Sequence, residues 1–222
     1  GVHYPQDSMV RRMKGPAGTK VKVTVKRDGE VIPFEITRGK IPMHSVDAAF
    51  MTSATDGYVR VSKFSRSTYE EFVKAIAGLR AQGMEHLVVD LRDNSGGYFD
   101  QALMMSNLFL PKDSLIVFLE GRKRAREDYR ADGRGPYQDL PVSLLINEGS
   151  ASSSEIFAGA LQDNHRATIV GRRSFGKGLV QEPINFTDGS GIRLTVARFH
   201  TPSGRCIQKP YTEDYAFEVY KR

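Results

Sequence analysis

The sequence contains a single cysteine, no apolar run of membrane-spanning length and no recognisable leader at its start. Cys206 alone excludes an internal disulfide framework and a CxxC metal site, and we expect it to be a small, semi-buried residue. A membrane helix needs about 20 apolar residues, whereas the longest apolar strings, HLVVDL and VSLLIN, have the length of strands. The first residues lack the apolar segment of a signal peptide and do not begin with Met, so we expect an excised piece of a longer protein.

Most of the chain also lacks an excess of either charge. Of the net charge of +6, residues 1–40 contribute nine Lys and Arg against four Asp and Glu, and residues 41–222 contribute 23 against 22. Near-neutrality of the larger part argues against a nucleic-acid channel, so no nucleic-acid partner is predicted. The one basic run, GRKRAR at residues 121–126, lies near acidic residues and is interpreted as a solvated hairpin or loop.

Strands alternate with helices between residues 50 and 205, which predicts the α/β class. Ser67 and Glu70 have the spacing of a capping box at the start of a helix, and residues 41–55 are interpreted as a connecting stretch. Strands are predicted at 58–64, 86–92, 115–120, 142–147, 167–171, 178–186 and 192–201, and helices at 67–83, 98–110 and 152–166.

Residues 1–40 form a separate β-rich piece. Valines alternate with lysines up to Asp28 and Gly29, and a second apolar run follows, which predicts a β-hairpin. A short helix is predicted before the hairpin. Two strands and a helix make a poor core, so we expect this piece to be the remainder of a larger module.

Loops at the carboxyl ends of parallel strands are the usual positions of sites in α/β folds. One such loop, EGSAS, follows the strand at 142–147 and leads into a helix. A serine there meets free N–H groups and the positive end of the helix, which favour an oxyanion. The alternative is structural, because Ser152 and Glu155 also have the spacing of a capping box. No histidine lies in a recognisable catalytic string and the G-x-S-x-G elbow is absent, so a Ser–His–Asp triad is unsupported.

Lysine is the other candidate base for such a serine. The string SFGKGLVQ places Lys177 between two glycines just before an apolar strand. If the site is closed off from water, desolvation would lower the pKa of Lys177 so that it could accept the serine proton. Gln181 lies four residues further on, on the same side of a strand, and could orient the lysine. A phosphate-binding or plain surface lysine is the alternative.

The string DNSGG supplies the backbone donors that would stabilise an oxyanion. Gly96 and Gly97 expose backbone N–H groups at a strand end, and together with the N–H of Ser153 such a donor makes an oxyanion hole. A glycine turn into the next helix explains the same residues, and the two interpretations are compatible.

Taken together, VVDLRDNSGG, GSASSSEIFAGALQDNHRATIVG and SFGKGLVQ resemble, in this order, the motifs of the C-terminal processing peptidases, also called tail-specific proteases. The resemblance runs from about Pro16 to Gln208. It implies a Ser/Lys dyad of Ser152 and Lys177 with Gln181 as the supporting residue. It also implies backbone oxyanion donors at Gly97 and Ser153, and a supporting loop that contains Asn94, Gly96 and Gly176. Two substitutions depart from the family pattern: Ser174 replaces a threonine and Ser153 replaces an alanine.

The resemblance also implies an architecture and a setting. The fold would be a ClpP/crotonase-like core of β-β-α units over residues 41–208. Residues 1–40 would be the C-terminal half of a PDZ-like domain, and residues 209–222 the start of a C-terminal extension. It implies protein or peptide substrates with accessible C-termini, no metal or cofactor, and a bacterial cell-envelope location in the periplasm. A homo-oligomer stays open.

The resulting hypothesis is a serine endopeptidase that cleaves proteins near their C-termini through an acyl-enzyme. The alternative is a non-catalytic peptide-binding scaffold of the same fold, against which the intact Ser152, Lys177 and Gln181 argue. An acyl-CoA enzyme of the crotonase type would need catalytic carboxylates, whereas the conspicuous loops carry serine and lysine instead.

Overall fold

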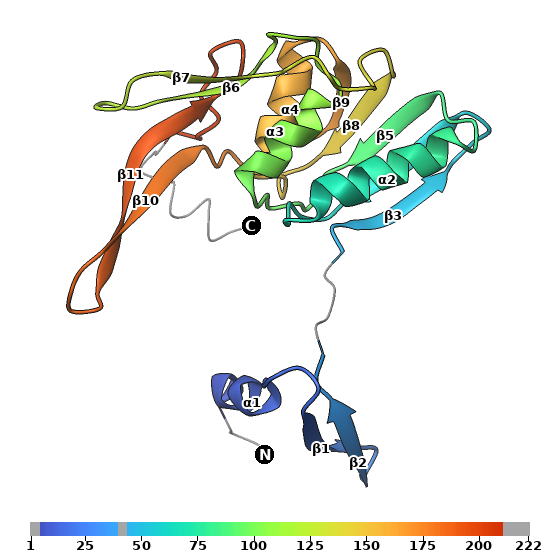
Figure 1. Ribbon diagram of the computed structural model, residues 1–222, viewed down its shortest axis with the longest axis vertical. Helices are drawn as coiled ribbons and strands as arrows, with labels where there is room; N and C mark the ends of the chain where they lie inside the picture. Colours follow the sequence, from blue (N-terminus) through green and yellow to red (C-terminus); the bar gives the residue numbers. More distant parts are fainter. Residues whose placement is uncertain (1–4, 40–43, 211–222) are drawn as a thin grey trace. The chain divides into compact units, whose positions relative to one another are not determined.

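The computed structural model describes residues 5–39 and 44–210, and the chain divides into two compact units, Gly1–Met43 and His44–Arg222 (Figure 1). The predicted C-terminal extension at 209–222 lies outside the described residues except for its first two positions. Within the described residues, no helix is long and apolar enough to cross a membrane.

The N-terminal unit consists of one helix and one hairpin, namely α1 (Gln6–Met13), β1 (Lys20–Arg27) and β2 (Glu30–Thr37). The two strands pair antiparallel along their whole lengths, so the predicted hairpin is confirmed. Its turn residues Asp28 and Gly29 have φ angles of 51° and 88°. Positive φ at both central residues is the two-residue turn whose twist matches that of the flanking strands.

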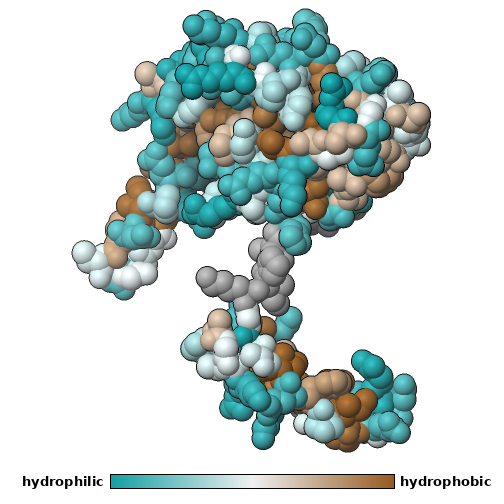
Figure 2. All heavy atoms as spheres, turned by 45° about the vertical axis from the view of Figure 1, so that its right-hand side comes forward, coloured by the Kyte–Doolittle hydropathy of each residue, from teal (hydrophilic) through white to brown (hydrophobic). Residues whose placement is uncertain are grey.

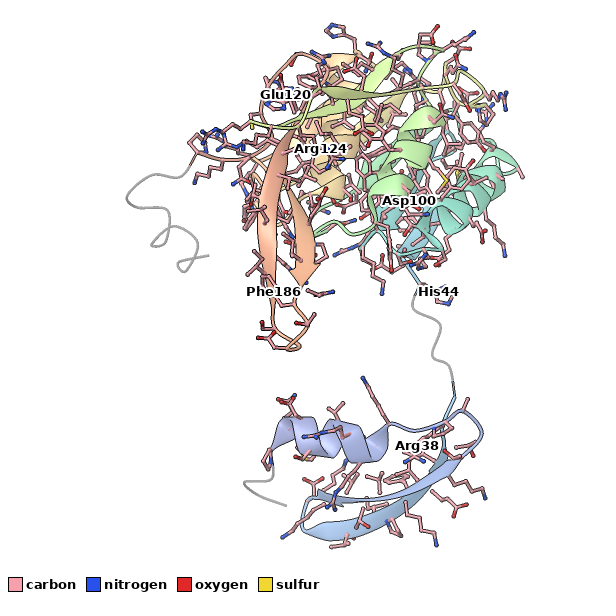
Figure 3. The ribbon with its side chains drawn as sticks, turned by 60° about the vertical axis from the view of Figure 1, so that its left-hand side comes forward. Arg38, His44, Asp100, Glu120, Arg124 and Phe186 are labelled. Atoms are coloured by element: carbon pink, nitrogen blue, oxygen red, sulfur yellow. The ribbon has the colours of Figure 1, made fainter. Side chains whose placement is uncertain are left out.

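Arg38 ties the helix of this unit to its hairpin (Figure 3). Its guanidinium donates hydrogen bonds to the carbonyl groups of Arg12 and Met13, at 3.0 and 2.8 Å, and to the Thr19 hydroxyl at 2.9 Å. Because the carbonyl groups at the end of a helix lack partners within the helix, Arg38 satisfies two of them from the strand side.

Even so, none of the described residues of the N-terminal unit is buried. Figure 2 shows brown, hydrophobic patches on the face of this unit that it presents. The large apolar side chains exposed in this unit are Met9, Val10, Met13, Val31, Phe34 and Ile36. A helix and a hairpin cannot cover these side chains, as the sequence pattern indicates.

The larger unit is built on a five-stranded sheet in the order β3-β4-β5-β8-β9. β3 runs antiparallel to β4, and all other neighbours are parallel. The predicted α/β class is thereby confirmed. The strands are β3 (Val46–Met51), β4 (Asp56–Val61), β5 (His86–Asp90), β8 (Val142–Ile146) and β9 (Ala167–Gly171).

A second sheet of four antiparallel strands has the order β10-β11-β6-β7. Its strands are β6 (Leu115–Glu120), β7 (Glu127–Arg130), β10 (Leu179–Asn185) and β11 (Gly191–His200). The basic run at 121–126 joins β6 to β7 and is therefore the predicted hairpin turn. The far part of β10 and β11 forms an arm that projects from the rest of this unit, with Phe186 near its tip (Figures 1 and 3).

Three helices complete the larger unit: α2 (Thr68–Arg80), α3 (Phe99–Asn107) and α4 (Ser153–Asp163). α2 packs on β3 and β4, whereas α4 packs on β9 on one side and on β6 on the other, next to α3. Three fully buried rings meet where the helices converge. Phe72, Phe109 and Phe157 have centroids 6.1 to 6.5 Å apart in edge-to-face arrangements, a preferred geometry for aromatic pairs.

The capping box predicted for Ser67 and Glu70 is wrong. Ser67 is the N-cap of α2, but its hydroxyl donates to the Glu71 carboxylate at 2.7 Å and no side-chain cap forms. The same carboxylate accepts the backbone N–H groups of Ser45 and Val46 at 2.7 and 3.0 Å. A contact between segments distant in the sequence has replaced the local cap.

Two further interpretations need correction. Residues 46–51 form the edge strand β3 instead of a connecting stretch. Its sequence, VDAAFM, has no regular alternation of polar and apolar residues. An edge strand has a neighbouring strand on one side only, so its side chains are buried less regularly than those of a central strand. Cys206 is exposed rather than semi-buried.

Candidate active site

Three loops meet at the carboxyl ends of neighbouring parallel strands. β5, β8 and β9 are adjacent in the sheet, and they lead into residues 91–97, 147–152 and 172–178, which carry the predicted site residues. Backbone bonds join the loops: Ala151 N–H donates to the Asn94 carbonyl and Phe175 N–H to the Ser150 carbonyl, both at 2.9 Å. The loops that carry the predicted site residues therefore lie together at the carboxyl edge of the sheet, the usual position of sites in α/β folds.

Ser152 is the N-cap of α4 and has a strained backbone, with φ 56° and ψ −115°. Positive φ is uncommon for a residue that carries a Cβ atom, and such strain persists only where the surroundings impose it. Ser152 is also partly exposed, although every other residue from 150 to 161 is buried. A strained, accessible serine on a strand-to-helix turn is the arrangement of a nucleophile elbow, here without the G-x-S-x-G signature.

The other three serines of this segment serve a different purpose. Each is at most 1% exposed, and each hydroxyl donates to a backbone carbonyl of the segment from residue 91 to residue 97. Ser150 donates to Leu91 at 2.7 Å, Ser153 to Gly97 at 3.0 Å and Ser154 to Asn94 at 2.9 Å. The hydroxyl groups of these three serines thus hydrogen-bond residues 150–154 to the 91–97 loop. Ser152 is the serine of this string that stays partly exposed.

The two predicted oxyanion donors are both free to donate. Ser153 is the first residue of α4, so its N–H has no partner within the helix. Phe64 bonds to the carbonyl of Gly96 and to the N–H of Tyr98, and therefore leaves the N–H of Gly97 unused. Within residues 5–39 and 44–210 neither N–H has a hydrogen-bond partner.

The two glycines of the 91–97 loop let its backbone lie close to Phe64 and to the start of α4. A Cβ atom on Gly97 would lie 2.0 Å from the Phe64 carbonyl oxygen, and one on Gly96 would lie 2.7 Å from the Ser152 Cβ and 2.9 Å from the Ser153 nitrogen. Asn94 is fully buried and holds the loop from within, since its Nδ2 donates to the Val61 carbonyl at 2.7 Å and its Oδ1 accepts the Gly96 N–H at 2.9 Å.

Glu155 connects the serine to the lysine loop. Its Oε2 accepts the backbone N–H of Ser152 at 2.9 Å and that of Lys177 at 2.8 Å, and its Oε1 accepts the N–H of Gly176 at 2.6 Å. The backbone nitrogens of Ser152 and Lys177 are therefore separated by no more than two hydrogen-bond lengths. The sequence pattern predicts Glu155 as the acid of a capping box. Its bond to the Ser152 N–H is the part of the box in which the acid accepts the N–H of the N-cap residue.

Lys177 lies in an irregular segment, two residues before β10 begins, so the argument that it shares a strand face with Gln181 is wrong. A register shift between Val180 and Gln181 interrupts the strand as well. Lys177 is exposed, so the described residues do not close it off from water.

Gln181 is exposed too, and its Nε2 lies 3.4 Å from the Thr195 hydroxyl. In the described part of the chain, the side chains of Ser152, Lys177 and Gln181 are not hydrogen-bonded to one another. Catalytic hydrogen bonds are often long before substrate binds.

A buried carboxylate anchors the start of the 91–97 loop. Asp90, at the end of β5, accepts hydrogen bonds from the Arg92 guanidinium at 2.7 to 3.1 Å and from the Tyr58 hydroxyl at 2.6 Å. Burial raises the pKa of the Asp90 carboxyl, but these bonds and the charge of Arg92 outweigh burial, so its pKa lies below the ordinary value.

Sequence reasoning missed the roles of Asp90, Arg92 and Glu155 at this site. The signal for Asp90 is a charged residue at the end of a continuous apolar strand, HLVVD, since an unpaired charge is rarely buried. Among the described residues, no group of three or more His, Cys, Asp or Glu could hold a metal ion.

The chain belongs to peptidase family S41, because the model of that family matches residues 56–217, which include all three loops. This confirms the resemblance to the C-terminal processing peptidases.

A carboxyl-terminal-processing protease of Synechocystis sp. is 40% identical over an alignment of 208 residues that covers 91% of this chain and 48% of that protein. A probable CtpA-like serine protease of Staphylococcus epidermidis is 38% identical over 93% of this chain and 42% of its own length. The solved structure of a photosystem II D1 C-terminal processing protease aligns with a TM-score of 0.69 and 33% identity, over 87% of this chain and 54% of that one. The chain thus spans less than half the length of these curated relatives.

Proposed function

We propose that the chain carries the catalytic part of a serine endopeptidase that cleaves proteins near their C-termini through a Ser152/Lys177 dyad. The observation that carries the proposal is the Glu155 carboxylate, one oxygen of which accepts the N–H of both Ser152 and Lys177. It fastens a strained, accessible serine to a lysine 25 positions further along the chain. The similarity to carboxyl-terminal-processing proteases supports the substrate class.

In the proposed acylation step, the neutral amine of Lys177 takes the proton of the Ser152 hydroxyl while Oγ attacks the scissile carbonyl carbon. The carbonyl oxygen becomes an oxyanion and accepts the free N–H groups of Gly97 and Ser153. When the C–N bond breaks, the proton passes from the Lys177 ammonium to the leaving amine, and an ester on Ser152 remains.

In the proposed deacylation step, Lys177 takes a proton from water as that water attacks the ester. The same two N–H groups stabilise the second oxyanion. Collapse returns the proton to Ser152 Oγ and releases the new C-terminus as a carboxylic acid, which then loses its remaining proton to water. Gln181 is the proposed orienting residue for Lys177, and its strand would need to adjust as substrate binds, because its amide now lies near Thr195.

The finer architecture is proposed with this function. Residues 41–208 would be a ClpP/crotonase-like core, and residues 1–40 the second half of a PDZ-like domain, whose exposed apolar surface would be covered by the first half. Residues 209–222 would begin a C-terminal extension. A periplasmic place in the bacterial cell envelope and protein substrates with accessible C-termini follow from the resemblance, and fractionation of the native cells tests the location.

The test is cleavage of casein, and of a peptide with a free apolar C-terminus, by the full-length protein. Ser152→Ala and Lys177→Ala should each abolish turnover, whereas the exposed controls Ser190→Ala and Lys112→Ala should keep it. Activity that survives in both site variants rules out the dyad. A wild-type protein that binds the peptide without cleaving it would indicate a peptide-binding scaffold.

A further inference from the structure

Ser153 contributes two groups to the proposed oxyanion hole, its backbone N–H and its side-chain hydroxyl. Its backbone N–H, free at the start of α4, is one of the two donors of the proposed function. Its hydroxyl is buried and donates to the carbonyl oxygen of Gly97, the residue that supplies the other donor, at 3.0 Å. The two donor residues are therefore joined directly by a side chain.

The other hydrogen bonds around Gly97 leave its own N–H and C=O to be oriented by the bond from Ser153. Phe64 holds the peptide groups on either side, since its N–H donates to the Gly96 carbonyl at 3.0 Å and its carbonyl accepts the Tyr98 N–H at 2.9 Å. In a parallel pairing of this kind, the residue between the two bonded groups turns its own N–H and C=O away from the partner strand. Both groups of Gly97 thus face the start of α4, where the Ser153 hydroxyl holds the C=O. Gly97 has φ of 150°, a conformation that side-chain-bearing residues rarely adopt.

We propose that the Ser153 hydroxyl is a positioning group that sets the Gly97 N–H relative to the Ser153 N–H. The inference rests on the proposed function, because it concerns the oxyanion of that reaction. The loop does not depend on this bond for its overall place, which the bonds from Ser150, Ser154 and the Ala151 N–H also secure. Loss of the hydroxyl should therefore loosen one donor more than it loosens the fold.

The test compares Ser153→Ala, Ser153→Thr and Ser106→Ala in the full-length protein with a cleavable peptide. Ser106 is a matched control, since its buried hydroxyl also donates to a carbonyl, that of Ala102 at 2.8 Å, but within α3. Removing a whole oxyanion donor typically costs about 100- to 1000-fold in kcat. Misplacing one should cost less, and we expect Ser153→Ala to lower kcat by about 5- to 50-fold without changing KM.

Four further comparisons separate a positioning effect from a structural effect. Ser153→Thr retains the hydroxyl and should restore most of kcat. Binding of a peptide aldehyde, which forms an oxyanion-like adduct on Ser152, should weaken in Ser153→Ala by the same factor as kcat. Ser106→Ala should lower the melting temperature without lowering kcat. Ser153→Cys fills the space with a weaker donor, so it should behave like Ser153→Ala even if the alanine variant folds poorly.

The proposal is overturned if Ser153→Ala keeps the wild-type kcat, or if Ser153→Thr is as impaired as Ser153→Ala. Ser152→Ala shows whether the proposed function itself has failed. If that variant still cleaves the peptide, the dyad is wrong, and the oxyanion role of Ser153 fails with it. If Ser152→Ala is inactive and Ser153→Ala is normal, only the positioning role fails.

A separate feature, independent of the serines, is a basic groove where the β6–β7 turn meets β11 and β10. Figure 3 labels two residues of its lining, Glu120 and Arg124. Its volume is about 1040 Å³. Its charged lining consists of Glu120, Arg122, Lys123, Arg124, Glu182 and Arg198.

The turn that carries Arg122, Lys123 and Arg124 is fixed in place. A Cβ atom on Gly121 would lie 2.0 Å from the Val196 carbonyl oxygen, so the turn rests directly on β11. Arg124 pairs with Glu182 at 2.8 Å and with Glu127 at 3.5 Å. By contrast, no ion pair involves the side chains of Arg122, Lys123 or Arg198 within the described residues.

The groove borders Gln181, the proposed orienting residue of Lys177. Glu182 directly follows Gln181, and Thr195, whose hydroxyl is 3.4 Å from the Gln181 amide, lines the groove. We infer that the groove binds an acidic segment of the polypeptide substrate. A polypeptide suits it better than a phosphate backbone or an anionic membrane, because the site is hollow and two carboxylates interrupt its cations. This inference rests on the proposed function for the origin of its ligand.

Two peptides with the same cleavable end, one with three Glu residues further along and one with Gln in their place, test the groove. Binding is measured on the inactive full-length Ser152→Ala protein, so the result does not depend on the chemistry. Exposed ion pairs are individually weak, so for the three Glu residues together we expect about 3- to 10-fold tighter binding of the Glu peptide, falling with salt. Adding Arg122→Ala and Arg198→Ala should remove the preference, and adding Lys112→Ala and Arg134→Ala should not. The inference is wrong if the Glu peptide has no advantage, if the groove variant keeps it, or if the groove residues instead govern binding to anionic vesicles or single-stranded DNA.

Discussion

Replacement of Glu155 by glutamine tests whether one carboxylate organises the candidate site. Glu155 is 7% exposed, and its two oxygens accept three backbone N–H groups, those of Ser152, Gly176 and Lys177. Glutamine has the same shape but only one accepting oxygen. If that oxygen keeps the position of Oε2, the amide NH₂ group faces the Gly176 N–H, and two donors meet.

The expected magnitude follows from these bonds. A hydrogen bond to a charged group contributes about 1.5–3 kcal/mol, and a buried donor left without a partner costs about 1–3 kcal/mol. The segment of Gly176 and Lys177 should therefore move away from α4. A displacement of about 1 Å in a reacting group can lower the rate by about 100-fold, so we expect a fall in kcat of that order with KM little changed.

The assay is steady-state cleavage of a peptide by the full-length protein, with urea unfolding of the same preparations. Glu148→Gln is the matched control, because Glu148 precedes the same helix but pairs with Arg172 at the surface, at 2.8 Å. An exposed pair of this kind contributes little, so the control should keep its activity. A Glu155→Gln protein with wild-type kcat would refute the idea that the carboxylate couples the serine to the lysine loop.

Three further outcomes are expected. Gly97→Ala should lower kcat by at least about 100-fold in the peptide assay, because its Cβ would lie 2.0 Å from the Phe64 carbonyl and displace an oxyanion donor; normal kcat would contradict this. Phe72→Ala should lower the free energy of unfolding by about 3–5 kcal/mol in urea titrations, since its ring is fully buried among two others; a loss below 1 kcal/mol would contradict the described core. The pKa of Asp90 is depressed in the folded chain, so its stabilisation is present above the unfolded value of about 3.9 and is lost as the pH falls through the lower folded value. The urea midpoint of the wild type should therefore fall more between pH 6 and pH 3 than that of Asp90→Asn, and equal slopes would argue against it.

Much of the fold could be predicted because its signals are local. The buried strand HLVVD, the helix that follows Ser67 and the Asp28-Gly29 turn each carry their own pattern of burial or backbone conformation. β3 could not be predicted, because its sequence, VDAAFM, has no strong alternation of polar and apolar residues. The Ser67 cap was wrong because Glu71 forms a tertiary contact that a local rule does not consider.

The site shows the same division. The position of Ser152 at a helix start is a local property, and so is the glycine content of the 91–97 loop. The hydroxyl bonds of Ser150, Ser153 and Ser154 depend on β5 lying beside β8 in the sheet, which the order of strands along the chain does not determine. The Lys177 to Gln181 argument assumed a continuous strand, and the actual start of β10 at Leu179 invalidates it.

Glu155 combines both kinds of information, and its two roles can be separated. As the acid of a capping box it stabilises α4 locally, and loss of a cap typically costs about 0.5–2 kcal/mol. As the acceptor for Gly176 and Lys177 it acts on a segment more than 20 positions away. Aspartate at this position keeps the charge near the helix start but is one methylene shorter, so it should stabilise α4 without reaching that segment. We therefore expect Glu155→Asp to unfold at a higher urea concentration than Glu155→Ala, because it keeps the cap, and yet to lose most of kcat. Equal retention of stability and activity would mean that the cap is the whole role of Glu155.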